Sequence, residues 1–294
     1  MDVKLRIESL DQLRGFAILS MVLVNVLGYY PIMPETFRHN LEDGFRFADF
    51  VAPLFVFLVG IGFRISFLKN QNSHGKWHAI KKSVHRFTIL FIVSVFVYHF
   101  SLNRMFWDAL TEIAIAGIFA IPVIGSAKQW PRILIAFAFL GLFPTARILG
   151  LQFEPFVWVF PLLIGSLVAD WIDDRKKMIL RTLIWGICLS LAGALIAIVV
   201  PNAIFITYIG CSFLITFCFY YIADVWKKPF PHLSTLGKNA IVVYILHYLI
   251  RNDLRSYIHS DAGYALALAS FVIVYIGCYA TAKYLERRNY FITI

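Results

Sequence analysis

Polar and charged side chains inside the apolar runs of this 294-residue chain give the first indication of chemistry. In the first run, Asp11 and Arg14 are three residues apart, and Asn25 follows Arg14 by eleven residues. On an α-helix they share one face, with Asn25 about 16 Å beyond Arg14. Charge within a bilayer costs about 2.5–3.5 kcal/mol per residue, so this stripe is expected to line a cavity or to contact polar partners. The structural alternative is an Asp11–Arg14 salt bridge with an asparagine that packs against another helix.

The start of this helix also has a recognisable pattern. Ser9 and Gln12 have the spacing of a capping box, in which each side chain bonds the backbone N–H of the other residue. This pattern predicts that the helix begins near Leu10.

His39 is the candidate general base. It is the single histidine of the segment between the first and second apolar runs, and Asp49 begins the second run. A neutral imidazole accepts a proton near physiological pH, so His39 could activate an amine or a hydroxyl. The alternative is a solvated loop side chain with no chemical role.

Two acids, Asp108 and Glu112, lie four residues apart in a later apolar run. On a helix they share a face and would repel each other if both were ionised. A cationic partner, a shared proton or a wet cavity is therefore expected, with simple helix packing as the alternative.

Another polar set lies near the end of the chain, at Asn239, His247 and Arg251. His247 and Arg251 are four residues apart, and His247 lies about 13 Å from the inner edge of its predicted helix, close to the bilayer midplane. With Asn25 and Glu112, these residues suggest a polar core, although a buried histidine can also be structural.

A basic segment without acids separates the second and third apolar runs. Its residues Lys76, Lys81, Lys82 and Arg86 could bind the phosphates of a nucleotide-containing donor. The alternatives are the positive-inside bias of membrane proteins and contact with anionic lipid.

The composition indicates which kind of protein must position these residues. The chain is 60% hydrophobic and 15% charged, whereas soluble domains are roughly 45–50% apolar and about 25% charged. The apolar runs are continuous and lack the alternating polarity of barrel strands, so they predict an all-α polytopic membrane protein. The net charge of +10 lies mostly on one side of the predicted membrane, which argues against nucleic acid as a partner. Four cysteines without CxxC spacing predict neither a disulfide framework nor a metal site.

The apolar windows predict ten transmembrane helices. They cover residues 10–31, 47–68, 84–102, 105–124, 131–149, 156–172, 179–200, 203–225, 239–258 and 262–285. Spans of about 20 residues leave only short loops, so a single transmembrane domain over residues 1–294 is expected. The first run lacks a cleavage site and is expected to be an uncleaved helix. Lysine and arginine fall mainly in the segments on the side of the N-terminus, which predicts that both termini are cytoplasmic.

Three stretches of the chain resemble a known family. They are the opening Ser9-Leu-Asp-Gln-Leu-Arg-Gly with Asn25 later in the same helix, the segment from His39 to Gly60, and Gly237-Lys-Asn239-Ala-Ile-Val-Val-Tyr244-Ile-Leu-His247. These motifs are similar to those of heparan-alpha-glucosaminide N-acetyltransferase and its bacterial relatives, within the transmembrane acyltransferases. The resemblance covers about 90 residues and is weak over the middle of the chain.

The resemblance implies a role for several residues. His39 matches the catalytic histidine of the family and Asn25 its catalytic asparagine, whereas related polysaccharide O-acyltransferases have a histidine at the position of Asn25. Arg14, Asp11 and Asp49 match motif positions without an assigned role. Glu42 replaces a usual aromatic residue, Ala52 replaces a common phenylalanine, and residues 31–38 differ in length and composition. These departures concern the identity of the acceptor.

The family implies transfer of an acetyl group from cytoplasmic acetyl-CoA to an amino-sugar or glycan acceptor on the other side of an inner (cytoplasmic) membrane. In this hypothesis, Arg14 and the basic segment bind the donor's phosphates, His39 is the base and Asn25 stabilises the oxyanion. The sequence is compatible with a homodimer but does not determine the oligomeric state. The main alternative is a secondary transporter of a small polar solute, although its usual paired helix breaks are not evident at Pro53, Pro122, Pro144 and Pro161. A non-catalytic assembly protein of the same fold is a third alternative.

Overall fold

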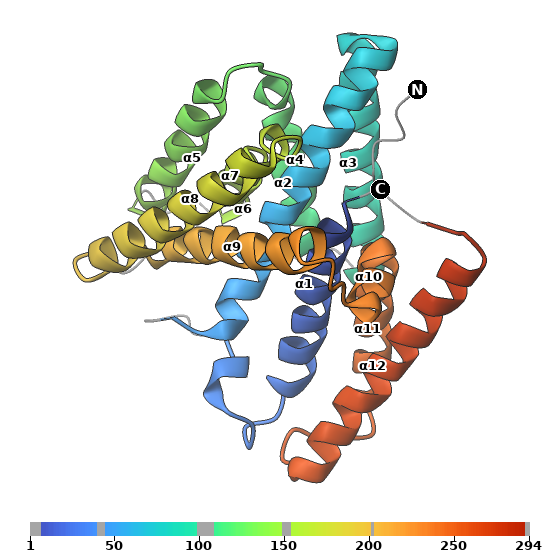
Figure 1. The fold of residues 1–294 in the computed structure, drawn as a ribbon. Helices are drawn as coiled ribbons and strands as arrows, with labels where there is room; N and C mark the ends of the chain where they lie inside the picture. The colour runs from blue at the N-terminus through green and yellow to red at the C-terminus, as the bar shows by residue number, and fades with distance from the viewer. Residues whose placement is uncertain (1–6, 40–44, 99–108, 149–153, 201–202, 292–294) are drawn as a thin grey trace. The chain divides into compact units, whose positions relative to one another are not determined.

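The computed structural model describes residues 7–39, 45–98, 109–148, 154–200 and 203–291. Every regular element in this part of the chain is helical, which confirms the all-α class (Figure 1). Asp108, one of the predicted polar residues, lies outside the described residues.

The described residues contain fewer candidate membrane spans than the ten that the sequence predicts. Among the described residues, five helices are long and apolar enough to cross a bilayer. They are α1 (Glu8–Leu27), α2 (Phe47–His74), α8 (Arg175–Ala197), α9 (Ile204–Tyr220) continued by the π-helical turn η4 (Tyr221–Val225), and α12 (Tyr264–Arg287). A sixth candidate is the pair α10 (Pro231–Lys238) and α11 (Ala240–Arg255), which is bent by 85°.

The other predicted spans contain shorter or less apolar helices. α4 (Ala109–Ile124) and α5 (Trp130–Ile148) contain only short apolar stretches. α3 (Lys76–Tyr98) begins within the basic segment, so its first turns are charged. The predicted helix 156–172 is divided into α6 (Glu154–Val157), α7 (Val159–Gly165) and the 3₁₀ turn η2 (Val168–Asp170).

The break within the predicted helix 156–172 and the bend at the start of the predicted helix 239–258 have identifiable causes. Pro161 has no N–H for the carbonyl of Val157, and its ring would clash with that carbonyl in a continuous helix, so α6 ends there. Asn239 separates α10 from α11 with φ −125° and ψ 38°, outside the helical region. Asparagine competes with helical hydrogen bonds through its side chain, which favours a break at this position.

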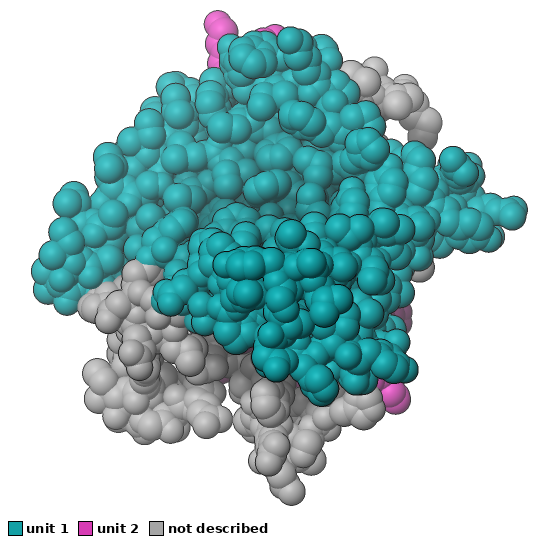
Figure 2. All heavy atoms as spheres, turned by 90° about the horizontal axis from the view of Figure 1, so that it is seen from below, with its two compact units in different colours: residues 1–55, 179–293 teal, residues 56–178, 294 magenta. Residues whose placement is uncertain are grey.

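The described contacts divide the chain into two compact units (Figure 2). Unit 1 contains residues 1–55 and 179–293, and unit 2 contains residues 56–178 and 294. The division falls within α2, between Phe55 and Val56. These are contact units of one chain, and a single functional domain over residues 1–294 stays a prediction.

In unit 1, α1 is the central helix and packs against α9, α10, α11 and α12. Its backbone approaches α10 very closely. A Cβ on Gly15 would lie 1.8 Å from the carbonyl oxygen of Leu233, and a Cβ on Gly237 would lie 1.8 Å from that of Asp11. Only glycine fits at these two positions, so the Arg14-Gly15 motif fixes how α10 lies on α1.

The N-terminus of α1 corrects the capping-box prediction. The helix begins at Glu8, and no side chain caps it locally. Ser9 Oγ and both polar atoms of the Gln12 side chain are buried without a hydrogen-bond partner. Instead, the backbone N–H of Ser9 donates to the carboxylate of Asp224 at 3.2 Å, and the hydroxyl of Ser234 donates to Glu8 at 2.6 Å. Tertiary contacts from η4 and α10 thus replace the local cap.

Burial differs strongly among the helices of unit 1. The apolar window of α1 is 72% buried, whereas those of α8 and α12 are 22% and 28% buried. Leu191, Leu195, Leu266 and Ile276 are among their large exposed apolar side chains. Exposed apolar surface on this scale is expected to contact lipid.

Unit 2 is built around the second part of α2. Close contacts join α2 to α7, because a Cβ on Gly60 would lie 1.9 Å from the carbonyl oxygen of Leu162. The Phe63 ring packs edge-on against Phe87 of α3 at 4.8 Å, and Gly117 of α4 lies directly against the Phe87 ring.

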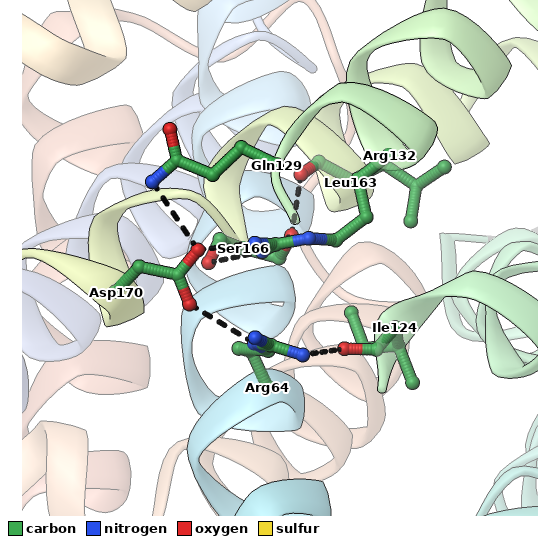
Figure 3. Close-up of polar contacts among 7 residues, drawn as sticks. All are labelled: Arg64, Ile124, Gln129, Arg132, Leu163, Ser166 and Asp170. Carbon is green, nitrogen blue, oxygen red and sulfur yellow. Dashed lines mark hydrogen bonds and ion pairs between the residues drawn. The ribbon is translucent and has the colours of Figure 1, made fainter. Parts of the chain in front are cut away.

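A buried polar network also lies within unit 2 (Figure 3). The carboxylate of Asp170 accepts hydrogen bonds from Arg64 of α2 at 3.1 Å, from Arg132 of α5 and from Gln129 at 3.4 Å. Arg132 also donates to Ser166, to the carbonyl oxygen at 3.0 Å and to the hydroxyl at 2.9 Å. Arg64 and Arg132 are both buried, so Asp170 joins α2, α5 and η2 through charge.

Candidate active site

His39 is held by Asp49, the acid that follows it in the matched motif. His39 Nδ1 lies 2.9 Å from Asp49 Oδ1. The His39 side chain is 60% exposed and that of Asp49 is 17% exposed, so the imidazole is open to solvent while the carboxylate is partly enclosed. Asp49 lies in the first turn of α2, which positions the carboxylate. With the proton on Nδ1, the Nδ1–H donates to Asp49 and the opposite nitrogen, Nε2, can accept a proton.

Ion pairs fix the segment that carries His39. Glu35, in the 3₁₀ turn η1 (Glu35–Phe37), lies 3.2 Å from Arg46 and 3.8 Å from Arg38. Arg46 also donates to the backbone carbonyl of Glu35 at 3.5 Å. Because Arg46 directly precedes α2, this pairing ties the turn before His39 to the start of the helix that carries Asp49.

Aromatic side chains pack beside this pair. Tyr208 of α9 is buried, and its ring lies 5.2 Å from Phe45 and 6.4 Å from Phe50. The Tyr208 hydroxyl interacts with the backbone amide of Arg46 and with the charge of Asp49. The start of α2 is therefore packed against α9 where the His39–Asp49 pair forms.

The second candidate, Asn25, meets a residue from the far end of the chain. Its Nδ2 lies 3.1 Å from Nε2 of His247, which is 1% exposed. The backbone carbonyl of Asn25 accepts a hydrogen bond from Arg255 at 3.1 Å. The Arg255 guanidinium also lies 4.2 Å from the centre of the Tyr29 ring. Asn25 thus contacts α11 inside unit 1, an arrangement that fits both the predicted polar core and the structural alternative of an asparagine packed against another helix.

Arg14 and Asp11 form the ion pair of the structural alternative, with Arg14 Nη1 3.2 Å from Asp11 Oδ1. The Asp11 side chain is 6% exposed, whereas that of Arg14 is 33% exposed. Binding of a donor phosphate by Arg14 stays a prediction.

The predicted phosphate-binding residues belong to unit 2, whereas Arg14 belongs to unit 1. Lys76, Lys81 and Lys82 are exposed on the first turns of α3, and Arg86 is half-buried. Lys82 donates to the side-chain oxygen of Asn70 on α2 at 3.0 Å, and Lys81 lies 5.6 Å from the Trp77 ring centre. Binding of the donor by these residues stays a prediction.

The remaining predicted polar residues have different surroundings. Glu112 lies in the first turn of α4, in unit 2, whereas Asn25 lies in unit 1. Arg251 stacks on Tyr248 at 4.7 Å and donates to the side chain of Asn252. Asn239 is fully buried at the break between α10 and α11.

Several residues of the site were not predicted. Arg255 donates to the backbone of Asn25, and Tyr208 interacts with the charge of Asp49. Both interactions arise from tertiary packing, which no local sequence pattern indicates. The Arg64–Asp170–Arg132 network had a sequence signal, because charges inside apolar runs are costly. Arg64 and Arg132 are among the basic residues whose distribution along the chain predicts orientation.

Comparison with known proteins shows which family the chain belongs to. The family described as "Heparan-alpha-glucosaminide N-acetyltransferase, catalytic" matches residues 6–193, a stretch that contains Asn25, His39 and Asp49. An uncharacterized 39.9 kDa protein from the amylase 3′ region of Bacillus acidopullulyticus is 34% identical over 130 residues. That match covers 42% of this chain and 36% of the relative, so the chain spans about a third of that protein's length. Because the family match covers well over half of the chain, the protein belongs to the heparan-alpha-glucosaminide N-acetyltransferase family of membrane acetyltransferases.

Proposed function

We propose that the protein transfers an acetyl group from cytoplasmic acetyl-CoA to an amino-sugar or glycan acceptor on the other side of the membrane. The acceptor nitrogen or oxygen attacks the thioester carbonyl, forms the new C–N or C–O bond and loses its proton to His39. The tetrahedral intermediate then expels the CoA thiolate as the C–S bond breaks, and the thiolate takes up a proton. The family match supports acetyl transfer, and the geometry of unit 1 supports the assignment of residues.

The pairing of His39 with Asp49 is the observation that carries this proposal. A general base needs an accessible nitrogen in the correct tautomer, and a carboxylate at the other nitrogen selects that tautomer. The 2.9 Å contact to Asp49 and the 60% exposure of His39 meet both requirements.

Asn25 is proposed as the oxyanion donor. Its primary amide has two N–H groups, and a single bond to His247 leaves the other for the developing negative charge. One such donor contributes about 3–4 kcal/mol in other enzymes. Arg14, whose side chain is 33% exposed and paired with Asp11, is proposed to bind a phosphate of the donor.

The test is acetyl transfer by the purified protein in proteoliposomes, with acetyl-CoA and a glucosamine glycoside as substrates. His39→Ala is expected to abolish transfer while leaving acetyl-CoA binding measurable, and added imidazole is expected to restore part of the rate because the site is open. Full turnover by His39→Ala would contradict the assignment.

The transporter alternative has one supporting feature. The 85° break between α10 and α11 is a broken apolar pair, and such breaks occur at the substrate sites of secondary transporters. Counterflow of unmodified glucosamine through the reconstituted protein would support transport. Formation of acetylated product without counterflow would exclude it.

A further inference from the structure

Phe45 is an exposed aromatic residue whose ring also packs against two buried aromatic side chains. Its side chain is 51% exposed, yet its ring lies 5.2 Å from Tyr208 and 6.3 Å from Phe50, nearly parallel to the latter at 26°. Tyr208 and Phe50 are themselves buried. A flexible surface side chain would lack such support, so Phe45 presents a fixed apolar surface.

This surface adjoins the His39–Asp49 pair. Phe50 directly follows Asp49, and the backbone N–H of Asp49 donates to the carbonyl of Arg46, the residue after Phe45, at 3.2 Å. Tyr208 contacts the Phe45 ring and also interacts with the charge of Asp49. The aromatic residues Phe45 and Phe50 and the partner of His39, Asp49, therefore lie within residues 45–50 and are braced by Tyr208 of α9.

A sugar ring has a chemical character that suits this arrangement. One face of a pyranose presents mainly C–H groups, whereas its hydroxyl and amino groups project at the edge. Binding sites combine such apolar surfaces with a few placed polar groups that fix orientation. An aromatic ring beside a general base offers both, because stacking holds the ring while a polar substituent reaches the imidazole.

We propose that Phe45, supported by Phe50 and Tyr208, is the surface on which the sugar ring of the acceptor stacks, with its amino or hydroxyl group directed to His39. This inference rests on the proposed acetyl transfer and extends it by naming the residue that selects a cyclic acceptor. The rival explanation is an aromatic anchor at the membrane–water interface, a common position for exposed aromatic side chains.

Steady-state kinetics with two acceptors would test the proposal. Methyl glucosaminide provides a ring, and ethanolamine provides an amine without one. Phe45→Ala is expected to raise the KM for the glycoside about tenfold, the upper range for one aromatic contact, while the KM values for acetyl-CoA and ethanolamine stay unchanged. Phe45→Trp is expected to keep native values and Phe45→Leu to lie between them.

The matched control is Tyr257→Ala, which removes another exposed aromatic side chain of unit 1, 76% exposed. It is expected to leave all KM values unchanged. An unchanged glycoside KM in Phe45→Ala would overturn the proposal, as would a rise of similar size for ethanolamine. Poorer reconstitution in both alanine variants, with native KM values, would favour the interfacial anchor and also overturn it.

A binding measurement separates this inference from the proposed chemistry. Saturation-transfer NMR of methyl glucosaminide on His39→Ala measures binding without turnover, and adding Phe45→Ala is expected to weaken the affinity fitted from the signal about tenfold. Normal turnover by His39→Ala would disprove the assignment of His39 as the base. The role of Phe45 would still be tested, because binding of the glycoside is measured without turnover. If Phe45→Ala misfolds, Phe45→Leu and Phe45→Trp give the same comparison at conserved bulk.

Discussion

The side-chain amide of Asn25 lies 3.1 Å from Nε2 of His247, although 222 residues separate them in the chain. If the amide N–H donates, Nε2 of His247 accepts, which requires a neutral imidazole with its proton on Nδ1. His247 is 1% exposed, so its ring is shielded from solvent. The contact therefore gives His247 a specific task, which is to orient the amide of Asn25.

This relationship predicts different effects for the two partners. Asn25→Ala is expected to lower kcat by about 10²–10³-fold, the range for loss of one oxyanion donor. His247→Leu keeps Asn25 but frees its amide to rotate, so a smaller loss, about 10- to 100-fold, is expected. Steady-state kinetics measures both, with the KM for acetyl-CoA expected to stay within a few-fold. A native kcat in His247→Leu would show that the amide needs no partner.

Asp49 is expected to act through His39. Asp49→Asn keeps the shape of the side chain but removes the charge, and its amide N–H can turn the imidazole to the wrong tautomer. A loss in kcat of about 10- to 100-fold is expected, as for other residues that orient a reacting group. The double variant His39→Ala/Asp49→Asn is expected to be no slower than His39→Ala, because Asp49 has no separate role. An additive loss would contradict this.

The sequence predicted local pairs of residues better than long-range partners. Spacing placed Asp11 and Arg14 on one helical face, and the ion pair between them is present. The chain also folds into helices within the predicted apolar ranges, because hydrophobic length is a local property. The capping box failed because Asp224 and Ser234, more than 200 residues away, reach the first turn of α1. No local pattern reports such contacts.

The same limit explains the difference in span number. Hydropathy cannot show that a proline will interrupt the segment 156–172, or that the short helix α10 will precede α11 at an angle of 85°. Similarly, the sequence around Phe45 gives no sign that Tyr208 will support it. Residues that depend on contacts with another helix can be identified only from the folded structure.

The close approach of α1 and α10 predicts a strict requirement for glycine. Gly237→Ala places a methyl group 1.8 Å from the carbonyl oxygen of Asp11, so the helices must separate. We expect a loss of thermal stability and of transfer, because Asp11 and Arg14 lie at this contact. Gly141→Ala is the control, since no atom lies within 4 Å of the added carbon, and alanine favours a helix by about 0.5–1 kcal/mol. Equal melting temperatures for the two variants would contradict the packing argument.

The buried network of unit 2 predicts a large effect on stability and none on chemistry. Asp170→Asn removes the carboxylate shared by Arg64 and Arg132, which leaves two buried guanidinium groups without a counter-charge. Breaking a buried ion pair in this way costs about 3–5 kcal/mol, so a clear drop in the melting temperature is expected in detergent. The folded fraction at low temperature is expected to keep its native KM for acetyl-CoA, because these residues are not assigned to the site.

A nearby exposed acid provides the control for this effect. Asp174 pairs with Lys177 at 2.9 Å, and the hydrogen bond from Lys177 holds the pKa of Asp174 below its usual value. A lowered pKa means that this pair stabilises the fold above the unfolded pKa and ceases to do so as the pH falls through the folded one. Water screens the pair, so Asp174→Asn is expected to leave the melting temperature unchanged at neutral pH. Equal melting temperatures for Asp170→Asn and Asp174→Asn would contradict the argument. They would mean that the buried carboxylate of Asp170 contributes no more to stability than the exposed one of Asp174, so the network would not be what joins α2, α5 and η2.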